Sequence, residues 1–260
     1  MEYLKLIAHF LTKAVNRRLR RKLRRMERKL QKVNEKYFAI QKKYILKKTK
    51  QLLDGSKSWD IKKKIDSIDE IFENMPDDEF VEEIIANSKA PMVLGAGTTI
   101  KKHKLGKFGI SFDLQHPLAL EYLQTDRPLL LAKLSETTKN GIKPILEQAL
   151  SQGWSYTDTA KLISENYALS DTRATMIAVN EIGHAYEVGN MIPLHDANDA
   201  GLNAQKYWST VRDDKVTEQC ATNEGDGWIG SEELFTSGDD SAPRDGHPRC
   251  RCTTKTRIVS

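Results

Sequence analysis

RRLRRKLRRMERKLQKVNEKYFAIQKKY, residues 17–44, is the stretch that decides the fold class of this chain. Apolar or aromatic residues recur in it at alternating intervals of four and three positions. They are Leu19, Leu23, Met26, Leu30, Val33, Tyr37, Ile40 and Tyr44. This heptad spacing is typical of a helix that presents an apolar seam to a partner helix. Because neither Gly nor Pro occurs before residue 55, the sequence predicts one continuous helix over residues 1–53.

Seven arginines are concentrated in the first part of this helix. They are Arg17, Arg18, Arg20, Arg21, Arg24, Arg25 and Arg28. Their mutual repulsion opposes close self-association unless an anionic surface neutralises it. Nucleic acid phosphates, an acidic protein face or a membrane surface would each do this. The arginines therefore predict a binding site for nucleic acid or an acidic partner. The alternative is a solvated charged face on a helix that packs against its own body.

The net charge of the 260-residue chain is +5, and this small average hides two opposite parts. Residues 1–50 contain 18 Lys and Arg against 3 Asp and Glu, whereas the remaining residues contain 23 against 33. A basic arm is therefore attached to an acidic body. No run approaches the roughly 18 apolar residues of a membrane span, and the arginines follow the first apolar positions. The sequence therefore predicts no integral membrane segment and no secretory signal.

Composition divides the chain into four predicted segments. A basic, heptad-bearing helix at 1–53 is followed by short helices and a Gly-rich linker at 54–111. A helical subdomain spans 112–200, and a small α+β module with a Cys/His cluster spans 201–260. The sequence therefore predicts a mainly α fold with a small α+β carboxy-terminal module and a long amino-terminal amphipathic helix.

Glycine and serine mark several predicted boundaries. Residues 91–111, PMVLGAGTTIKKHKLGKFGIS, contain four glycines without a helical period. They are predicted to form a flexible connection rather than a phosphate-binding loop. Gly153 is predicted to end one helix, and Ser155 and Ser170 to begin the next two. Alternating residues at 206–211 and in the carboxy-terminal tail predict two paired strands.

An ordered series of short motifs spans residues 112–254. It includes MIAVNEIGHAYEVGN at 176–190, YWSTVRDDKVTEQC at 207–220, a Gly-rich loop and HPRCRC at 247–252. In this order the motifs resemble the phage Mu F-like head morphogenesis proteins, which are minor head proteins of tailed bacteriophages. Many of these relatives carry a second Cys or His shortly after the first cysteine, where this chain has Asn223.

The resemblance implies a virion structural protein and not an enzyme, so no catalytic residue is assigned. The implied partners are the phage portal protein, packaged double-stranded DNA, and the major capsid or scaffold protein; a homo-oligomer is a further option. The implied location is the interior of the head near the portal, and the host cytoplasm during assembly. A role in DNA packaging or ejection would follow. The alternative is a DNA-binding ejection factor that acts through the arginine-rich helix.

Cys220, His247, Cys250 and Cys252 form one candidate metal site. Thiolates and imidazole are typical zinc ligands, and four of them would close a tetrahedral structural site. Two other interpretations stay open: reduced cysteines packed as small hydrophobic residues, or a disulfide from Cys220 to Cys250 or Cys252. Cys220 with His247 would also suit a nucleophile and its base, but no third orienting residue accompanies them. If these residues bind a metal, structural zinc is the predicted cofactor.

Two further enzymatic interpretations rest on few residues. WST at 208–210 and EE at 232–233 faintly resemble the Ser-Thr-Ser and Glu-x-Glu elements of ADP-ribosyltransferases. The serine triplet is incomplete and the glutamates are adjacent, so the pattern departs from those enzymes. Asp213, Asp214 and Glu218 would suit a divalent cation for nuclease chemistry, although acidic loops usually face water.

Overall fold

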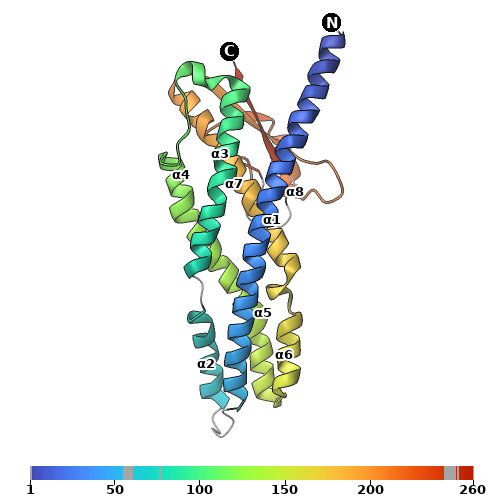
Figure 1. Cartoon of the computed structure of the whole chain (residues 1–260), viewed down its shortest axis with the longest axis vertical. Coiled ribbons are helices and arrows are strands. Elements are labelled where there is room, and N and C mark those ends of the chain that lie inside the picture. The colour runs from blue at the N-terminus through green and yellow to red at the C-terminus, as the bar shows by residue number, and fades with distance from the viewer. Residues whose placement is uncertain (1, 55–60, 76–77, 243–249, 251, 260) are drawn as a thin grey trace. The chain divides into compact units, whose positions relative to one another are not determined.

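The computed structural model of the chain (Figure 1) describes residues 2–54, 61–75, 78–242, 250 and 252–259. Side chains are described from residue 17 onward, except for those of residues 61–63, 66, 78 and 126–131. Helices dominate, and one small antiparallel sheet lies in the carboxy-terminal part. The predicted fold class and the long amino-terminal helix are therefore confirmed. None of the described helices combines the length and the hydropathy that a membrane span requires.

The elements follow one another in chain order. They are α1 (Glu2–Asp54), α2 (Ile61–Glu73), α3 (Asp78–His103), η1 (Leu105–Phe108), α4 (Pro117–Glu121), the π-helical η2 (Tyr122–Asp126), α5 (Arg127–Gln152), α6 (Tyr156–Glu165), η3 (Tyr167–Leu169), α7 (Asp171–Asp199), β1 (Asn203–Ser209), α8 (Glu218–Gly225), β2 (Trp228–Gly230) and β3 (Thr253–Val259). Internal contacts group them into two compact units. Unit 1 comprises residues 1–30, 87–120 and 178–260, and unit 2 comprises residues 31–86 and 121–177. The units cut across the four predicted segments, because α1, α3 and α7 each contribute residues to both.

Within unit 2, the buried face of α1 only partly follows the predicted heptad seam. Tyr37 of the seam is buried, whereas Ile40 of the seam is 39% exposed. The other buried residues of this part of the helix include Asn34, Phe38, Gln41, Ile45 and Thr49. The heptad pattern therefore marks the core of this unit only in part, and pairing of the seam with another helix stays a prediction.

The helices of unit 2 assemble around α5. It contacts α2, α6 and η3, and Figure 1 shows α2, α5 and α6 alongside the carboxy-terminal half of α1. One carboxylate links two of these helices, since Asp69 of α2 lies 2.7 Å from Lys139 Nζ and 2.8 Å from Lys143 Nζ of α5. Hydrogen bonds from these two lysines hold the pKa of Asp69 below its usual value.

A buried guanidinium joins three further segments of unit 2. Arg173 of α7 donates to Thr138 Oγ1 at 3.0 Å, to the Leu134 carbonyl at 2.8 Å, and to the Ala168 carbonyl. Its Cζ atom also lies 5.0 Å from the centre of the Phe38 ring on α1. Burial lowers the pKa of Arg173. These partners compensate for the desolvation of the charge, so the side chain stabilises the junction of α1, α5 and α7.

Within unit 1, α3 and α7 approach each other through two glycines. A Cβ atom on Gly95 would fall on the carbonyl oxygen of Tyr186 and within 2.9 Å of the Asn190 amide nitrogen. A Cβ atom on Gly189 would likewise fall on the carbonyl group of Met92. The absence of these side chains therefore allows the two helix backbones to meet.

The predicted linker at 91–111 is wrong for most of its length, because α3 continues through His103. The helix contains Pro91, Gly95 and Gly97, which ordinarily interrupt helices. The contact of Gly95 with α7 gives the physical reason: tertiary packing compensates for the low helix propensity. Gly95 serves helix packing, whereas the chain turns at Lys104, whose φ is 55°, and again at Gly109, whose φ is 77°.

Local boundary signals were predicted correctly. Ser155 accepts a hydrogen bond from the Asp158 amide at 3.1 Å, and Ser170 accepts one from the Arg173 amide at 3.2 Å. Gly153 ends α5 with a φ of 68°.

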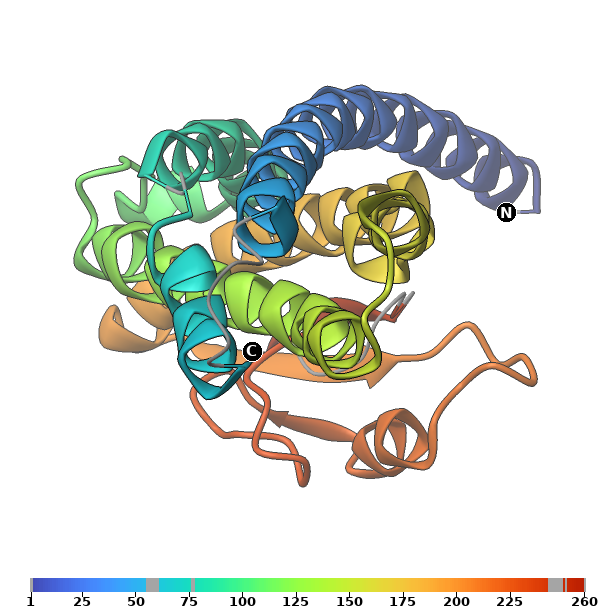
Figure 2. The ribbon, with the colours of Figure 1, turned by 90° about the horizontal axis from the view of Figure 1, so that it is seen from below.

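The sheet has the strand order β2-β1-β3, and both pairings are antiparallel. The tail therefore pairs with the first strand, as the alternation predicted. Figure 2 shows the strands and α8 gathered on one side of α7. The face of the sheet that bears Ala204, Lys206 and Trp208 is buried, whereas the opposite face is open.

Two alanine substitutions in α3 test the role of its glycines. We expect Gly95→Ala to lower the free energy of unfolding by about 3 kcal/mol, because the added methyl group meets backbone atoms that cannot move aside. Gly97→Ala is the matched control, since nothing lies within 4 Å of a Cβ at that position. It should leave stability unchanged or raise it by up to about 1 kcal/mol. Urea titrations followed by circular dichroism measure both, and equal effects would refute the packing argument.

Candidate functional site

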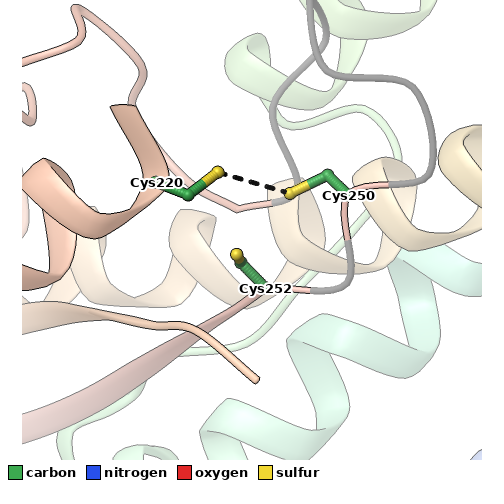
Figure 3. A group of neighbouring side chains, drawn as sticks. All are labelled: Cys220, Cys250 and Cys252. Atoms are coloured by element: carbon green, nitrogen blue, oxygen red, sulfur yellow. Dashed lines mark hydrogen bonds between the residues drawn. The ribbon is translucent and has the colours of Figure 1, made fainter. Parts of the chain in front are cut away.

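Three cysteines from two segments converge in the carboxy-terminal module. Cys220 lies in the first turn of α8, and Cys250 and Cys252 lie just before β3. All three are buried free thiols, and their sulfur atoms lie within 4.8 Å of one another. Cys220 Sγ and Cys250 Sγ are 4.0 Å apart, and Figure 3 shows the sulfurs facing a common centre. The structure thus brings together three of the four predicted metal ligands, and the fourth, His247, lies outside the described residues.

The position of Cys220 follows from the local sequence. Thr217 is the N-cap of α8, and its hydroxyl accepts a hydrogen bond from the Cys220 amide at 3.4 Å. The three thiols share a hydrophobic cluster with Trp208, Phe235 and Ala242. Trp208 and Phe235 meet edge to face at 5.1 Å between ring centres. The thiols are therefore held by a packed aromatic core, which the cysteine spacing alone did not reveal.

The thiol group is poorly ionised in this environment. A hydrogen bond with Cys250, together with burial, raises the pKa of Cys252 far above that of an ordinary thiol. Burial also raises the pKa of Cys220. Nucleophilic catalysis requires a thiolate, so the geometry gives no support to a reactive Cys220.

Asn223 of α8 is hydrogen-bonded to the loop that follows β2. It is buried, its Nδ2 atom donates to Ser237 Oγ at 2.7 Å, and its Oδ1 atom accepts from the Ser237 amide at 3.1 Å. The position that carries a second Cys or His in many relatives therefore fastens the loop after β2 to α8.

The residues that faintly resemble elements of ADP-ribosyltransferases form local hydrogen bonds within the carboxy-terminal module or face solvent. Thr210 donates to Glu224 at 2.6 Å, and Glu224 also accepts from Arg212 at 3.2 Å. Glu233 accepts from the Gly230 amide at 3.1 Å, while its neighbour Glu232 is exposed. Sequence reasoning missed Glu224, whose partners lie 12 and 14 residues before it.

The acidic residues proposed for nuclease chemistry do not gather around a common point. They are Asp213, Asp214 and Glu218. Within the part of the chain that the structure describes, the thiols are the one group of three or more potential ligands whose donor atoms lie this close.

The seven predicted arginines of α1 are all exposed. With about 3.6 residues per turn, Arg17 to Arg28 cover an arc of about 160° and a length of about 17 Å. Leu19, Leu23 and Met26 lie on the opposite side of the helix and are half-buried. The helix therefore presents one cationic face, although the guanidinium groups do not converge on a single point.

The open face of the sheet combines aromatic and cationic side chains. Tyr207 of β1 is directly opposite Trp228 of β2 and Lys255 of β3. The Tyr207 and Trp228 ring centres are 5.5 Å apart, and Lys255 Nζ lies 5.4 Å from the Tyr207 ring centre. Arg257 Cζ lies 4.3 Å from the ring centre of Trp228, which is 37% exposed. This surface was not predicted, because the sequence alone does not place the strands in register.

Side chains of α3 and α7 bond backbone groups at the outer edge of β3. Lys102 Nζ donates to the Thr256 carbonyl at 2.8 Å, and Glu187 accepts from the backbone of Thr254. Glu187 also accepts from Asn190 Nδ2 at 2.9 Å, and His103 Nε2 lies 2.8 Å from Thr256 Oγ1. Two backbone groups of this edge strand are thereby satisfied.

The ionisable side chains at the outer edge of β3 have pKa values that are shifted from their usual values. Burial raises the pKa of Glu187 to about 8 and lowers that of His103 to about 4, with Lys102 contributing to the second shift. Burial also lowers the pKa of Lys102. Near neutral pH the network therefore favours a protonated Glu187 and a neutral His103.

Residues 140–255 match the family model described as Phage Mu protein F like protein. The match runs from α5 into β3 and includes α6, α7, β1, α8 and β2. It confirms the resemblance predicted from the motif series and indicates a phage head-related protein. No curated protein and no solved structure matches the chain.

The edge network predicts a pH dependence of stability. The raised pKa of Glu187 stabilises the fold fully below about pH 4.5, and this contribution is lost as the pH rises through about 8. The lowered pKa of His103 acts oppositely: its contribution is present above about 6.5 and lost as the pH falls through about 4. Glu187→Gln should therefore gain stability relative to the parent chain as the pH rises from 5 to 8, by at most about 1.4 kcal/mol per pH unit.

Urea titrations at several pH values measure this difference. Glu232→Gln, at an exposed position, is the control and should follow the parent chain throughout. Parallel pH curves for Glu187→Gln and the parent chain would contradict the buried-carboxylate assignment.

Proposed function

From the match to the Mu protein F-like family, we propose that this chain is a minor head protein of a bacteriophage. It associates with the portal vertex during head assembly and assists DNA packaging or ejection. Its partners are the portal protein and, beside it, packaged DNA and the major capsid or scaffold protein. It resides inside the head near the portal, after assembly in the host cytoplasm.

The match over residues 140–255 is the observation that carries this proposal. It covers the thiol cluster, the sheet and α7, and it leaves out the arginine-rich part of α1. A property shared by the family therefore belongs to the carboxy-terminal part of the chain. We assign the portal contact to that part.

The open sheet face is the surface best suited to a protein partner. Aromatic residues and arginine contribute most to protein interfaces, and Trp228 and Arg257 lie together on this face. Because the Arg257 guanidinium also bonds Gln205 Oε1 at 2.6 Å, the aromatic and cationic groups are already ordered before binding. Ordered side chains lose less conformational entropy on association.

The arginine face of α1 is assigned to a second, anionic partner. Packaged DNA and an acidic surface of the portal both satisfy its charge. If DNA is the dominant partner, the chain acts instead as a DNA-binding ejection factor, which is the alternative function. The one-sided array of seven exposed arginines is the observation that favours this alternative.

Substitution on the sheet face tests the portal contact. Trp228→Ala should weaken co-purification with the cognate portal protein roughly tenfold or more, because a partly exposed aromatic residue at the centre of a contact carries much of its binding energy. Leu234→Ala is the matched control, since Leu234 is a 62% exposed hydrophobic residue of the same module outside the strands. Pull-down and light scattering measure complex formation. Equal binding by both variants would move the contact elsewhere.

Neutralising the arm tests the anionic partner. Affinity of the parent chain for duplex DNA of any sequence should fall about 10³-fold or more between about 50 and 200 mM salt, if six or more phosphates are contacted. Replacing all seven arginines with Gln should abolish both the binding and its salt dependence. Replacing them with Lys retains the charge and should preserve the salt slope. Fluorescence anisotropy with a labelled duplex measures each affinity.

The two assays together separate the functions. Under the main proposal, the Gln variant still binds the portal while the Trp228→Ala variant still binds DNA. Loss of portal binding in the Gln variant would reassign the portal contact to the arm. Salt-insensitive or absent DNA binding by the parent chain would remove the ejection-factor alternative.

A further inference from the structure

The spacing of the three cysteine sulfurs is close to that of metal ligands. Tetrahedral zinc with Zn–S bonds of about 2.3 Å places its sulfur ligands about 3.8 Å apart. Cys220 Sγ and Cys250 Sγ are 4.0 Å apart, and Cys252 Sγ completes a triangle whose sides do not exceed 4.8 Å. We propose that Cys220, Cys250 and Cys252 bind a structural zinc ion.

A buried donor beside the sulfurs is the second observation. The indole N–H group of Trp208 is fully buried and finds no hydrogen-bond acceptor of the ordinary kind among the residues that the structure describes. The ring lies in the same cluster as the thiols and interacts with Cys252. A buried N–H without an acceptor costs stability, whereas an N–H directed at a metal-bound thiolate is satisfied and stabilises the ligand. Trp208 thus fits a module whose cysteines are thiolates.

The chain segments that carry the ligands also fit a metal site. Cys220 lies at the amino-terminal end of α8, where the helix dipole favours a negative charge. Cys250 and Cys252 precede β3 by three residues and one residue. A bound ion would cross-link α8 to the start of β3, across a module whose strands have only seven, three and seven residues. So small a sheet gains more from a cross-link than a large core would.

The metal preference of thiolate ligands indicates which ion this site would bind. Soft sulfur ligands favour zinc over magnesium or calcium, and three cysteines are fewer than the four of an ordinary iron–sulfur cluster. Three thiolates leave one position of a tetrahedral ion for a further ligand. His247, which the sequence predicts for that position, lies outside the described residues, and the three cysteines are the ligands that we propose.

Metal analysis of the full chain tests the proposal. The chain is purified under reducing conditions without chelator, and zinc is measured by mass spectrometry of the elements. We expect about one zinc per chain, with loss in Cys220→Ser and Cys252→Ser. Less than about 0.2 equivalents in the parent chain, after zinc is offered during purification, would overturn the inference. A Cys220–Cys250 disulfide in metal-free, zinc-challenged protein would overturn it as well.

Two controls separate ligation from general destabilisation. Gly189→Ala disturbs the helix crossing of unit 1 without touching the thiols, so it should retain the zinc. Trp208→Phe removes the N–H group together with part of the ring, and should retain the zinc with roughly 10- to 100-fold lower affinity. Zinc loss in Gly189→Ala equal to that in Cys252→Ser would show that metal content reports folding alone, and would refute the assignment of ligands.

Cobalt gives a readout that does not depend on variants. Co²⁺ added to chelator-treated parent chain should produce the visible absorption of a tetrahedral ion and the charge-transfer bands of thiolate ligands. Zinc should then displace it and abolish both. Octahedral cobalt spectra, or spectra without thiolate bands, would contradict coordination by the three cysteines.

Discussion

The close crossing of α3 and α7 is the constraint on which unit 1 depends. Gly95 and Gly189 each lie against a backbone carbonyl of the other helix, where no side chain fits. Interiors are packed too densely to absorb an extra methyl group between two backbones. The crossing therefore fixes which residues of the helices face each other, and Thr99 meets Asn190 at 3.0 Å as a consequence.

The same two helices hold the edge of the sheet. Beyond the crossing, α3 directs Lys102 and α7 directs Glu187 to the outer backbone groups of β3. An unprotected edge strand would be open to pairing with other chains, and these two ionisable side chains bond its outer backbone groups instead. Their abnormal pKa values are the cost of this arrangement.

Features specified by neighbouring residues were predictable from the sequence, and features specified by distant residues were not. Ser155 and Gly153 act on backbone groups within a few positions, so the helix ends around them were predicted correctly. Gly95 was misassigned to a linker, because only α7 shows why a helix needs a glycine there. The thiol cluster was predictable because few cysteines occur and two of them are adjacent in a strand-like pattern. Glu187 was missed, since its partner strand lies far along the chain.

A count of charges does not distinguish one cationic side chain from another, whereas the structure shows that their environments differ. In the body, Lys206 is buried and paired with Asp240, and Arg257 is stacked on Trp228. The arginines at 17–28 are exposed on one side of α1. Salt screens such exposed charges strongly but affects a stacked aromatic surface much less. A contact through the sheet face would therefore persist under conditions that release the arm from a polyanion. One chain would then stay attached to a protein partner while its arm exchanges between anionic surfaces.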